Sequence, residues 1–319
     1  MEKILVTGAG GFLGGAVTQA LLARGNRVIG LDCGPNAAAL DAMGAGCSDF
    51  IVEIADICDA GTLDRIFATH RPGAVIHCAA VVGVLASLSS PAHLIRVNIE
   101  GSVNLFEAMR WHGCGRMIHI SSEEIYGDFL APRIDETHRE MPLHAYGISK
   151  AAVEHLGRSY RAAYGLECIN IRTSWVYGPG FPRDRVPINM IRAAAEGRAC
   201  HVPSGAEERI DHTYLDDAVA GILGALDCPS HPFDAYHIAS DTAPSLAEIA
   251  EAICELVPGA EITVGPGSYR HGGDVPIPAK GALDCSRARE VFGYRPRFDI
   301  RAGLSAMLAA HRAVLAEQG

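Results

Sequence analysis

The stretch Ile4-Leu5-Val6-Thr7-Gly8-Ala9-Gly10-Gly11-Phe12-Leu13-Gly14 determines the fold class of this chain. A short apolar run, typical of a buried strand, leads into glycines at the spacing Gly-x-x-Gly-x-x-Gly. Apolar residues then recur every three or four positions as far as Leu21, which predicts a helix. Gly25-Asn26 ends that helix, and Arg27–Leu31 predicts the next strand. This strand-helix-strand unit predicts an α/β fold with a doubly wound, mostly parallel sheet of the Rossmann type.

The glycine turn has the properties of a dinucleotide site. Glycines let a pyrophosphate approach the backbone where the free N–H groups of a helix N-terminus point outward. Asp32 ends the second strand, about twenty residues further on. A carboxylate there accepts hydrogen bonds from the adenosine ribose and repels a 2′-phosphate, so the sequence predicts NAD rather than NADP. The alternative is an ordinary strand-helix turn with a surface Asp.

The third predicted strand, Phe50–Ile54, is followed by two predicted cofactor contacts, Asp56 and Ile57. We expect Asp56 to meet the adenine. Its structural alternative is a cap for the helix predicted over residues 63–68.

Two further strands end in small residues. The apolar segment 74–80 runs into Ala79 and Ala80, beside which a cofactor has room to lie. The strand predicted over 117–120 delivers Ser121-Ser122 to its carboxyl end. Ligands bind at that edge of open parallel sheets, so these residues are expected at the site.

Tyr146 and Lys150 are separated by three residues and lie one helical turn apart on one helix face. An ammonium beside a phenol favours the phenolate, which moves the pKa of a base with an ordinary value of about 10 toward neutrality. Such a base can take a proton from a hydroxyl while hydride leaves the same carbon. Many ordinary helices carry this pair, so the assignment depends on the upstream motifs.

Composition disfavours several classes of protein. The 319 residues are enough for one large domain or two smaller ones, and a net charge of -10 disfavours a nucleic-acid or membrane-surface binder. Ten scattered cysteines without a Cys-x-x-Cys pair, and no signal peptide, predict reduced thiols in the cytoplasm and no metal site. Residues 72–95 carry no Asp, Glu, Lys or Arg. We interpret them as a buried strand and a small-residue loop rather than a membrane span.

Two acidic segments in the second half are interpreted as structural. Asp216-Asp217 precedes an apolar helical pattern, and Ser245-x-x-Glu248 fits a capping box. The C-terminus predicts an amphipathic helix with an apolar side formed by Leu304, Met307, Leu308 and Val314.

In this order, the motifs resemble those of the extended short-chain dehydrogenase/reductases, in particular the NAD-dependent epimerase/dehydratase family. The resemblance covers nearly the whole chain. It rests on Thr7–Gly14, Asp32, 77–80, Asn98, Ser121–Gly127, Tyr146–Lys150, 176–179 and 214–217.

The resemblance implies a role for each matched residue. Tyr146 is the acid/base, Lys150 lowers its pKa and holds the nicotinamide ribose, and Ser122 orients the reacting oxygen. Asn98 supports the helix and a water near Lys150. The cofactor contacts implied at the turn are Gly8, Gly11, Phe12, Leu13 and Gly14. A homodimer through the helices that start near Asn98 and Tyr146 is implied as well. Sequence alone does not tell whether the apolar seam of Leu105, Phe106, Met109, Val153 and Leu156 lies within or between chains.

Glu123 and Glu124 directly follow Ser122. By resemblance, sugar-nucleotide 4,6-dehydratases and some decarboxylases carry a Glu at the position of Glu124, and the 4,6-dehydratases also carry an acidic residue at the position of Glu123. A carboxylate beside a transient ketone can abstract a proton from the neighbouring carbon, as dehydration or epimerisation there requires. The structural alternative is a solvated pair at a strand end, with Glu124 bound to backbone.

The substrate region departs from the family pattern. Trp175 stands where many members place an Asn that contacts the substrate diphosphate, and Ile210 takes the place of an Arg that is displaced to Arg209. Arg270 lies in a segment that resembles an Arg-x-Gly-Asp element but is one residue longer. Trp175, Arg209 and Arg270 are substrate-binding candidates, together with Ser122 and Glu123. The two arginines are possible anion clamps or, alternatively, surface salt-bridge residues.

We expect interleaved domains: residues 1–172 and 213–242 as an NAD-binding Rossmann domain, and 173–212 and 243–319 as a substrate-binding region. The leading function is an NAD-dependent enzyme that transiently oxidises a hydroxyl of a sugar or nucleotide-sugar and uses the ketone for epimerisation or elimination. One alternative is a dehydrogenase that releases NADH from a small polyol or sugar acid, which Trp175 and the displaced arginine favour. The other is a non-catalytic NAD-sensing protein, disfavoured because all four catalytic-type residues are present.

Overall fold

The computed structural model describes residues 3–272 and 274–318, and the chain divides into two compact units. Unit 1 comprises Met1–Gly127, Arg139–Arg172 and Ile222–Tyr236. Unit 2 comprises Asp128–His138, Thr173–Gly221 and His237–Gly319. These boundaries differ from the expected ones at 128–138, 213–221 and 237–242, which fall in unit 2.

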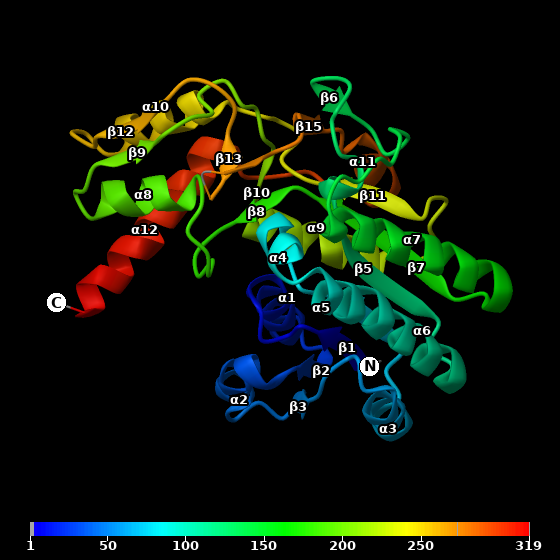
Figure 1. Ribbon diagram of the computed structural model, residues 1–319. Helices are drawn as coiled ribbons and strands as arrows, with labels where there is room; N and C mark the ends of the chain where they lie inside the picture. Colours follow the sequence, from blue (N-terminus) through cyan, green and yellow to red (C-terminus); the bar gives the residue numbers. More distant parts are fainter. Residues whose placement is uncertain (1–2, 273, 319) are drawn as a thin grey trace. The chain divides into compact units, whose positions relative to one another are not determined.

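A seven-stranded sheet forms the centre of unit 1, in the order β11-β7-β5-β4-β1-β2-β3 (Figure 1). β1 pairs in parallel with β2 and β4, β2 with β3, and β4 with β5. The predicted Rossmann-type sheet is therefore confirmed. The strands are β1 (Lys3–Thr7), β2 (Arg27–Asp32), β3 (Phe50–Ile54), β4 (Ala74–His77), β5 (Arg116–Ser122), β7 (Glu167–Thr173) and β11 (Ala235–Ile238).

Helices cover this sheet because its side chains alternate between two apolar faces. One face carries a core formed with α3, α6 and α7, and in Figure 1 α5 and α6 follow one another end to end, with α7 alongside. The helices are α1 (Phe12–Ala23), α2 (Ala37–Gly44), α3 (Ala60–His70), α4 (Val84–Ser89), α5 (Pro91–Ile95), α6 (Gly101–His112) and α7 (Ala145–Tyr164). Short turns are the 3-10 helices η1 (Gly34–Asn36) and η3 (Glu123–Ile125) and the π-helical turn η2 (Arg96–Glu100).

The predicted loop after β4 is wrong, because α4 and α5 form there. Both helices are short and carry small or apolar residues, so their stability depends on packing rather than on a helical pattern. Pro91 at the first position of α5 suits a helix start. No helix in the described part of the chain is long and apolar enough to cross a membrane.

Unit 2 is built from four short strand pairs and helices. The pairs are β6 (Arg133–Ile134) with β15 (Ala282–Leu283), β8 (Trp175–Tyr177) with β10 (His212–Tyr214), β9 (Cys200–Val202) with β12 (Ile262–Val264), and β13 (Arg270–His271) with β14 (Val275–Pro276). The helices are α8 (Ile188–Ala195), α10 (Leu246–Leu256), α11 (Ser286–Phe292) and α12 (Ile300–Gln318). Helix α9 (Leu215–Asp227) begins in unit 2 and ends in unit 1.

The predicted helix signals of unit 2 are largely confirmed. Ser245 and Glu248 form a reciprocal capping box at α10. The carboxylate of Asp217, which is 1% exposed, accepts from the backbone N–H groups of Arg297 and Phe298 at 2.9–3.0 Å, so its role is structural but extends beyond its own helix. Of the four apolar residues predicted for α12, Leu304, Met307 and Leu308 are buried, whereas Val314 is 47% exposed.

Candidate active site

The glycine turn is held against the end of β4. Gly8 has a φ of +70°, and a Cβ on it would lie 2.7 Å from the backbone nitrogen of Ala79. A Cβ on Gly14 would lie 2.0 Å from the carbonyl oxygen of Gly8, so only glycine fits either position. Helix α1 begins after Gly11, and none of the described side chains caps it. The N-terminus of α1, at Phe12, Leu13 and Gly14, is therefore the kind of backbone segment that binds an anion such as a dinucleotide pyrophosphate.

Asp32 lies at the end of β2 and is only 6% exposed. One carboxylate oxygen accepts from the Gly10 amide at 2.9 Å and the Asn36 side chain at 3.1 Å, and the other from the Cys33 amide at 2.8 Å. Because each oxygen can accept a further hydrogen bond, Asp32 both fixes the glycine turn and keeps acceptor capacity for a ribose. The turn, the uncapped helix and this carboxylate together fit NAD.

Asp56 and Ile57, the predicted cofactor contacts after β3, both have contacts within unit 1. Asp56 accepts from the Cys58 amide at 2.9 Å, and the residue that caps α3 is Asp59, which accepts from the Thr62 amide at 3.0 Å. The capping alternative for Asp56 was therefore wrong. Ile57 is 4% exposed and packs in the core against Gly101, so its side chain is committed to the sheet–helix interface.

Asn98 lies in the π-helical turn between α5 and α6 and is 2% exposed. Its side-chain oxygen accepts from the Val81 amide at 2.8 Å, and its nitrogen donates to the Val81 carbonyl at 3.1 Å and to the Ser149 hydroxyl at 3.0 Å. Asn98 thus ties the segment after β4, which includes Ala79 and Ala80, to helix α7. Single π turns of this kind are frequent at functional sites.

Ser122 ends β5, and its hydroxyl accepts from the Glu124 amide at 3.2 Å. Glu123 and Glu124 follow in η3 and are 1% and 8% exposed. The alternative of a solvated pair is therefore wrong, since both carboxyl side chains are buried. A Cβ on Gly147 would lie 2.3 Å from the carbonyl oxygen of Glu124, so this glycine lets the first turn of α7 approach η3.

Tyr146 and Lys150 lie in α7, 8% and 4% exposed. The Lys150 ammonium is 6.0 Å from the centre of the Tyr146 ring and donates to the Ile120 carbonyl at 2.7 Å. Burial lowers the pKa of Lys150 to about 8, while Cys78 and Glu154 oppose that shift. The predicted catalytic residues Asn98, Ser122, Glu124, Tyr146 and Lys150 all lie in unit 1.

A buried ion pair that we did not anticipate stands one turn beyond Lys150. The Glu154 side chain is fully buried and receives the Arg172 guanidinium at 2.6 Å and the Ser121 hydroxyl at 2.5 Å. Arg172 also donates to the Tyr126 hydroxyl at 2.8 Å. This network fixes α7 against the end of β5. Its sequence signal was weak, because charged residues in helices and strands are usually exposed.

In unit 2, Trp175 is 5% exposed inside an aromatic cluster. Its ring stacks on His271 with centroids 5.3 Å apart, and the Arg185 guanidinium lies 4.8 Å from its centre. Arg185 is a basic residue that the motifs did not single out, and it donates to the Val176 carbonyl at 2.9 Å.

The two candidate anion clamps already have partners in unit 2. Arg209 forms a two-pronged salt bridge with Glu248, at 3.2 and 3.0 Å, which favours the salt-bridge alternative. Arg270 donates to the Asp274 carbonyl at 2.9 Å. Ile210 is fully buried.

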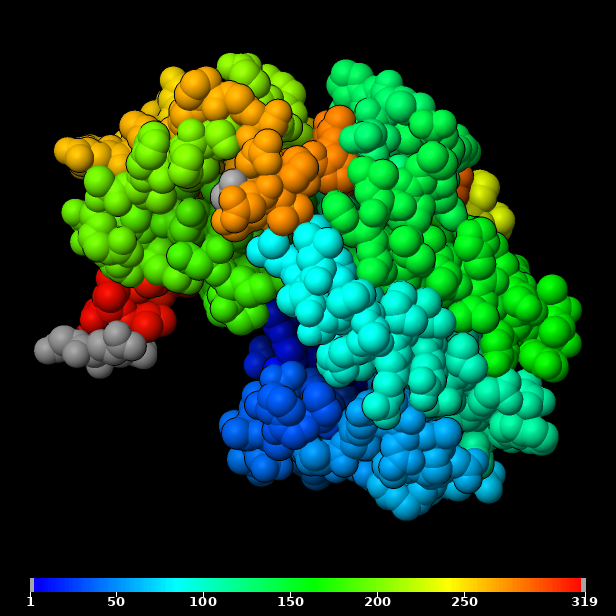
Figure 2. Space-filling model, in the orientation of Figure 1, coloured from blue at the N-terminus to red at the C-terminus, as the bar shows by residue number. Residues whose placement is uncertain are grey.

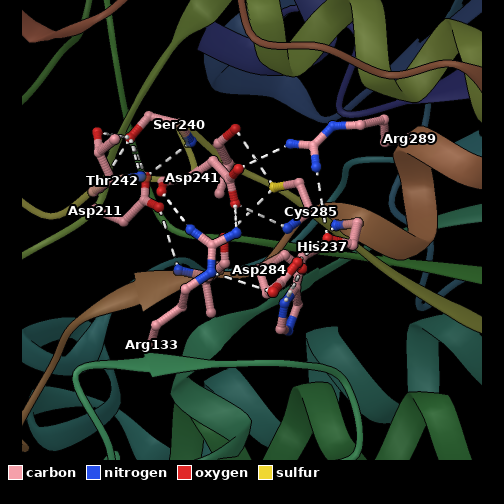
Figure 3. Close-up of polar contacts among 12 residues, drawn as sticks. Arg133, Asp211, His237, Ser240, Asp241, Thr242, Asp284, Cys285 and Arg289 are labelled. Carbon is pink, nitrogen blue, oxygen red and sulfur yellow. Dashed lines mark hydrogen bonds and ion pairs between the residues drawn. The ribbon is translucent and has the colours of Figure 1, made fainter.

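Asp211 holds three segments of unit 2 together (Figure 3). Its carboxylate accepts from the Ser240 amide and hydroxyl at 2.9 and 2.7 Å and from the Leu283 amide at 3.3 Å. Beside it, Asp241 pairs with Arg133 at 2.6 Å and Arg289 at 2.8 Å. Asp211 therefore has a structural role in unit 2.

Comparison with known proteins agrees with this geometry. The profile of the NAD dependent epimerase/dehydratase family matches residues 4–239. The chain belongs to the NAD-dependent epimerase/dehydratase family. Members of this family are NAD-dependent enzymes of the extended short-chain dehydrogenase/reductase type, so this chain is such an enzyme and NAD is its cofactor.

Relatives within the epimerase/dehydratase family include both reaction types. The chain is 32% identical to a dTDP-glucose 4,6-dehydratase of Shigella flexneri over 95% of this chain and 90% of the relative. It superimposes on UDP-glucose 4-epimerase of Thermotoga maritima, solved with UDP-glucose, with a TM-score of 0.83 and 27% identity over 98% and 99% of the two chains. With UDP-glucuronic acid 4-epimerase of Bacillus cereus, solved with UDP-glucuronic acid and NAD, the TM-score is 0.86 at 26% identity over 98% and 99%.

Proposed function

We propose that this enzyme removes water from the hexose of a nucleoside-diphosphate sugar. The main support is the buried pair Glu123–Glu124 in η3. The pair directly follows Ser122 and packs against the first turn of α7 at Tyr146–Gly147. Two carboxyl groups at that place supply an acid and a base in addition to Tyr146. The 4,6-dehydratases among the relatives support the same reaction class.

Tyr146 acts first as the base that takes the proton from a sugar hydroxyl. Lys150 stabilises the phenolate electrostatically, and Ser122 hydrogen-bonds the oxygen as it becomes a ketone. NAD, when bound, accepts hydride from the carbon that carries this oxygen and returns hydride at the end of the cycle. Asp32 and the amides of α1 hold the cofactor, as their geometry fits.

The elimination then uses the two glutamates. The ketone makes the C–H bond on the neighbouring carbon acidic, and Glu124 takes that proton. Glu123 donates a proton to the hydroxyl one carbon further, which leaves as water while a carbon–carbon double bond forms. A proton from Glu124 to the neighbouring carbon, with the hydride that bound NAD would return to the terminal carbon, would complete the product with the net loss of one water.

Glu124→Gln tests the proposal because it keeps size and hydrogen bonding but removes the base. We expect product formation to fall by about a hundredfold to ten-thousandfold while the first oxidation persists, so reduced cofactor accumulates in a single turnover. Absorbance of the reduced nicotinamide and exchange of the carbon-bound proton in deuterated solvent measure the two steps. Glu100→Gln, at an exposed position of η2, is the control. Unchanged turnover without deuterium exchange would rule out elimination.

The second candidate is a net dehydrogenase acting on a smaller polyol or sugar acid. Trp175 in place of the diphosphate-contacting Asn, and the buried Ile210, favour it. This enzyme would release reduced cofactor stoichiometrically with product and would tolerate Glu124→Gln.

We further propose a homodimer through α6 and α7, which lie at the surface in Figure 2. Four of the five expected seam residues, Leu105, Phe106, Met109 and Val153, belong to the chain's own core. A second apolar stripe, partly or fully exposed at four-residue spacing, remains for a partner. It comprises Ile95, Ile99 and Val103 with Ile148, Ala152 and Leu156. At the far ends of the helices, Arg110 lies between the exposed Trp111 and Tyr164 rings, 4.2 and 4.8 Å from their centres.

We assign the enzyme to the cytoplasm. All ten cysteines are free thiols, which suits a reducing compartment. The negative net charge leaves a small sugar-type substrate, rather than a nucleic acid or a membrane, as the expected partner.

A further inference from the structure

Thr7, His77 and His119 occupy the same level of three adjacent strands. Thr7 lies opposite His77 in the β1–β4 register, and His77 lies opposite His119 in the β4–β5 register. They are 0%, 2% and 1% exposed, and the proposed reaction uses none of them. Thr7 and His77 end their strands and lead directly into the glycine turn and the segment Cys78–Val81.

The direction of each hydrogen bond around His77 follows from proton counting. The Ser102 hydroxyl donates its single proton to the Asn98 carbonyl at 2.5 Å, so it must accept from Nε2–H of His77 at 2.9 Å. Burial lowers the pKa of His77 to about 3, so the ring is neutral and Nδ1 is an acceptor. The Thr7 hydroxyl then donates to Nδ1 at 2.7 Å and accepts from the Ala79 amide at 3.2 Å.

This chain of hydrogen bonds fixes the segment 79–81 from both sides. Ala79 is held through Thr7, and Val81 is held through the side chain of Asn98, whose backbone carbonyl ends the same chain. Ala79 is also the residue against which Gly8 is packed. One imidazole therefore links the glycine turn, the predicted cofactor contacts Ala79 and Ala80, and Asn98.

We propose that His77 is a positioning residue for the NAD site, which acts as a neutral ring with its proton on Nε2. It sets the orientation of the Thr7 hydroxyl and thereby the distance between the glycine turn and the segment after β4. It touches neither cofactor nor substrate. Loss of its ring leaves the buried hydroxyls of Thr7 and Ser102 without their partner. The glycine turn and the segment 79–81, which we call the NAD cradle, are then held less firmly.

His119 provides a matched comparison within the same sheet. Its ring lies 5.8 Å from that of His77, is equally buried and is also kept neutral by burial. Its Nδ1, however, is paired with the Asn170 side chain at 2.9 Å, and Asn170 donates to the Asp234 carbonyl. That network leads to β7 and β11, away from the glycine turn. Removal of either ring lowers the free energy of unfolding, but only removal of the His77 ring disturbs the NAD cradle formed by the glycine turn and segment 79–81.

The experiment measures NAD affinity by calorimetry on the purified full chain, for wild type, His77→Leu and His119→Leu, with thermal stability recorded in parallel. We expect His77→Leu to weaken NAD binding about tenfold and to speed amide exchange at Ala79 and Val81. We expect His119→Leu to lose comparable stability with unchanged affinity. Equal dissociation constants for the two variants would overturn the proposal.

Two further measurements decide the matter if His77→Leu does not fold. Thr7→Val removes the hydroxyl that joins Ala79 to the ring at little change in shape, and it is expected to weaken NAD binding similarly; wild-type affinity would count against the linkage. Nitrogen NMR of the wild-type histidines should show Nε2–H and bare Nδ1 for His77 from pH 5 to 8. A ring protonated at Nδ1, or one that titrates in this range, would contradict the assigned hydrogen-bond directions.

Discussion

At the scale of single residues, the buried Lys150 ammonium serves catalysis but lowers the stability of the fold. Its pKa falls from 10.5 to about 8 because burial penalises the ammonium. Between these values the unfolded chain binds a proton that the folded chain does not, so the free energy of unfolding rises with pH in that window. Below about pH 8 the full cost of burying the Lys150 ammonium lowers the free energy of unfolding. The enzyme retains this cost because its chemistry requires the charge.

Lys150→Met should therefore abolish turnover yet make the NAD-free chain more stable at pH 7. We expect a gain of about 1–3 kcal/mol, less than the pKa shift alone implies, because the Ile120 carbonyl loses its donor. The difference from wild type should shrink as pH rises from 7 to 10. Urea unfolding at several pH values measures it. Lys3→Met is the control, since Lys3 also donates to a carbonyl, that of His70. A variant less stable than wild type at pH 7 would contradict the argument.

Asp32 is expected to decide between the two nicotinamide cofactors. Asp32→Asn keeps an acceptor for the Gly10 amide but removes the charge that faces a 2′-phosphate. The ratio of NADP to NAD affinity should rise by about tenfold or more, with modest weakening of NAD. Titration of both cofactors against wild type and variant tests this. Wild-type preference retained in the variant would remove Asp32 from its assigned role.

At the scale of elements, the approach of α7 to η3 depends on Gly147. In Gly147→Ala the new Cβ would meet the Glu124 carbonyl at 2.3 Å, and backbone is poorly able to yield. We expect a loss of about 1–3 kcal/mol in stability together with reduced kcat, because Tyr146 and Glu124 move apart. Gly115→Ala, where a Cβ has open space, is the control. Equal stability and kcat in both variants would show that the contact is unimportant.

The elements that sequence predicted are those with local causes. The glycine turn, the strands beside it and the Ser245 capping box depend on residues close in sequence, so pattern was enough. Helices α4 and α5 were missed because their short, uncharged segments have no helical repeat and form through packing. Asp56 and Asp59 look alike in sequence, and only backbone geometry shows which one caps α3.

The site divides in the same way. The motif residues of unit 1 were predictable, because each is carried by a recognisable segment. Two features could not be predicted: the burial of Glu123 and Glu124, and the Glu154–Arg172 ion pair. Charged side chains are normally exposed, and their burial depends on partners far along the chain. The link from Thr7 to His77 crosses 70 positions and requires the strand register.

At the scale of the whole molecule, the proposed dimer is tested by its mass. Light scattering at micromolar concentration should give twice the chain's 33.7 kDa. Val103→Glu, which places a charge in the partly exposed stripe, should shift the mass to one chain, whereas Ser159→Glu at an exposed position of α7 should not. A monomer mass for the wild type would refute the dimer.

The chain's two tryptophans give each unit its own optical signal. Trp111 in unit 1 is 70% exposed, so its emission is red-shifted and open to iodide quenching, whereas Trp175 in unit 2 is 5% exposed and stacked on His271. Trp111→Phe leaves a fluorophore that reports only on unit 2, and Trp175→Phe leaves one that reports only on unit 1. Denaturation followed in the two single-tryptophan proteins would then reveal whether the units melt together or in sequence.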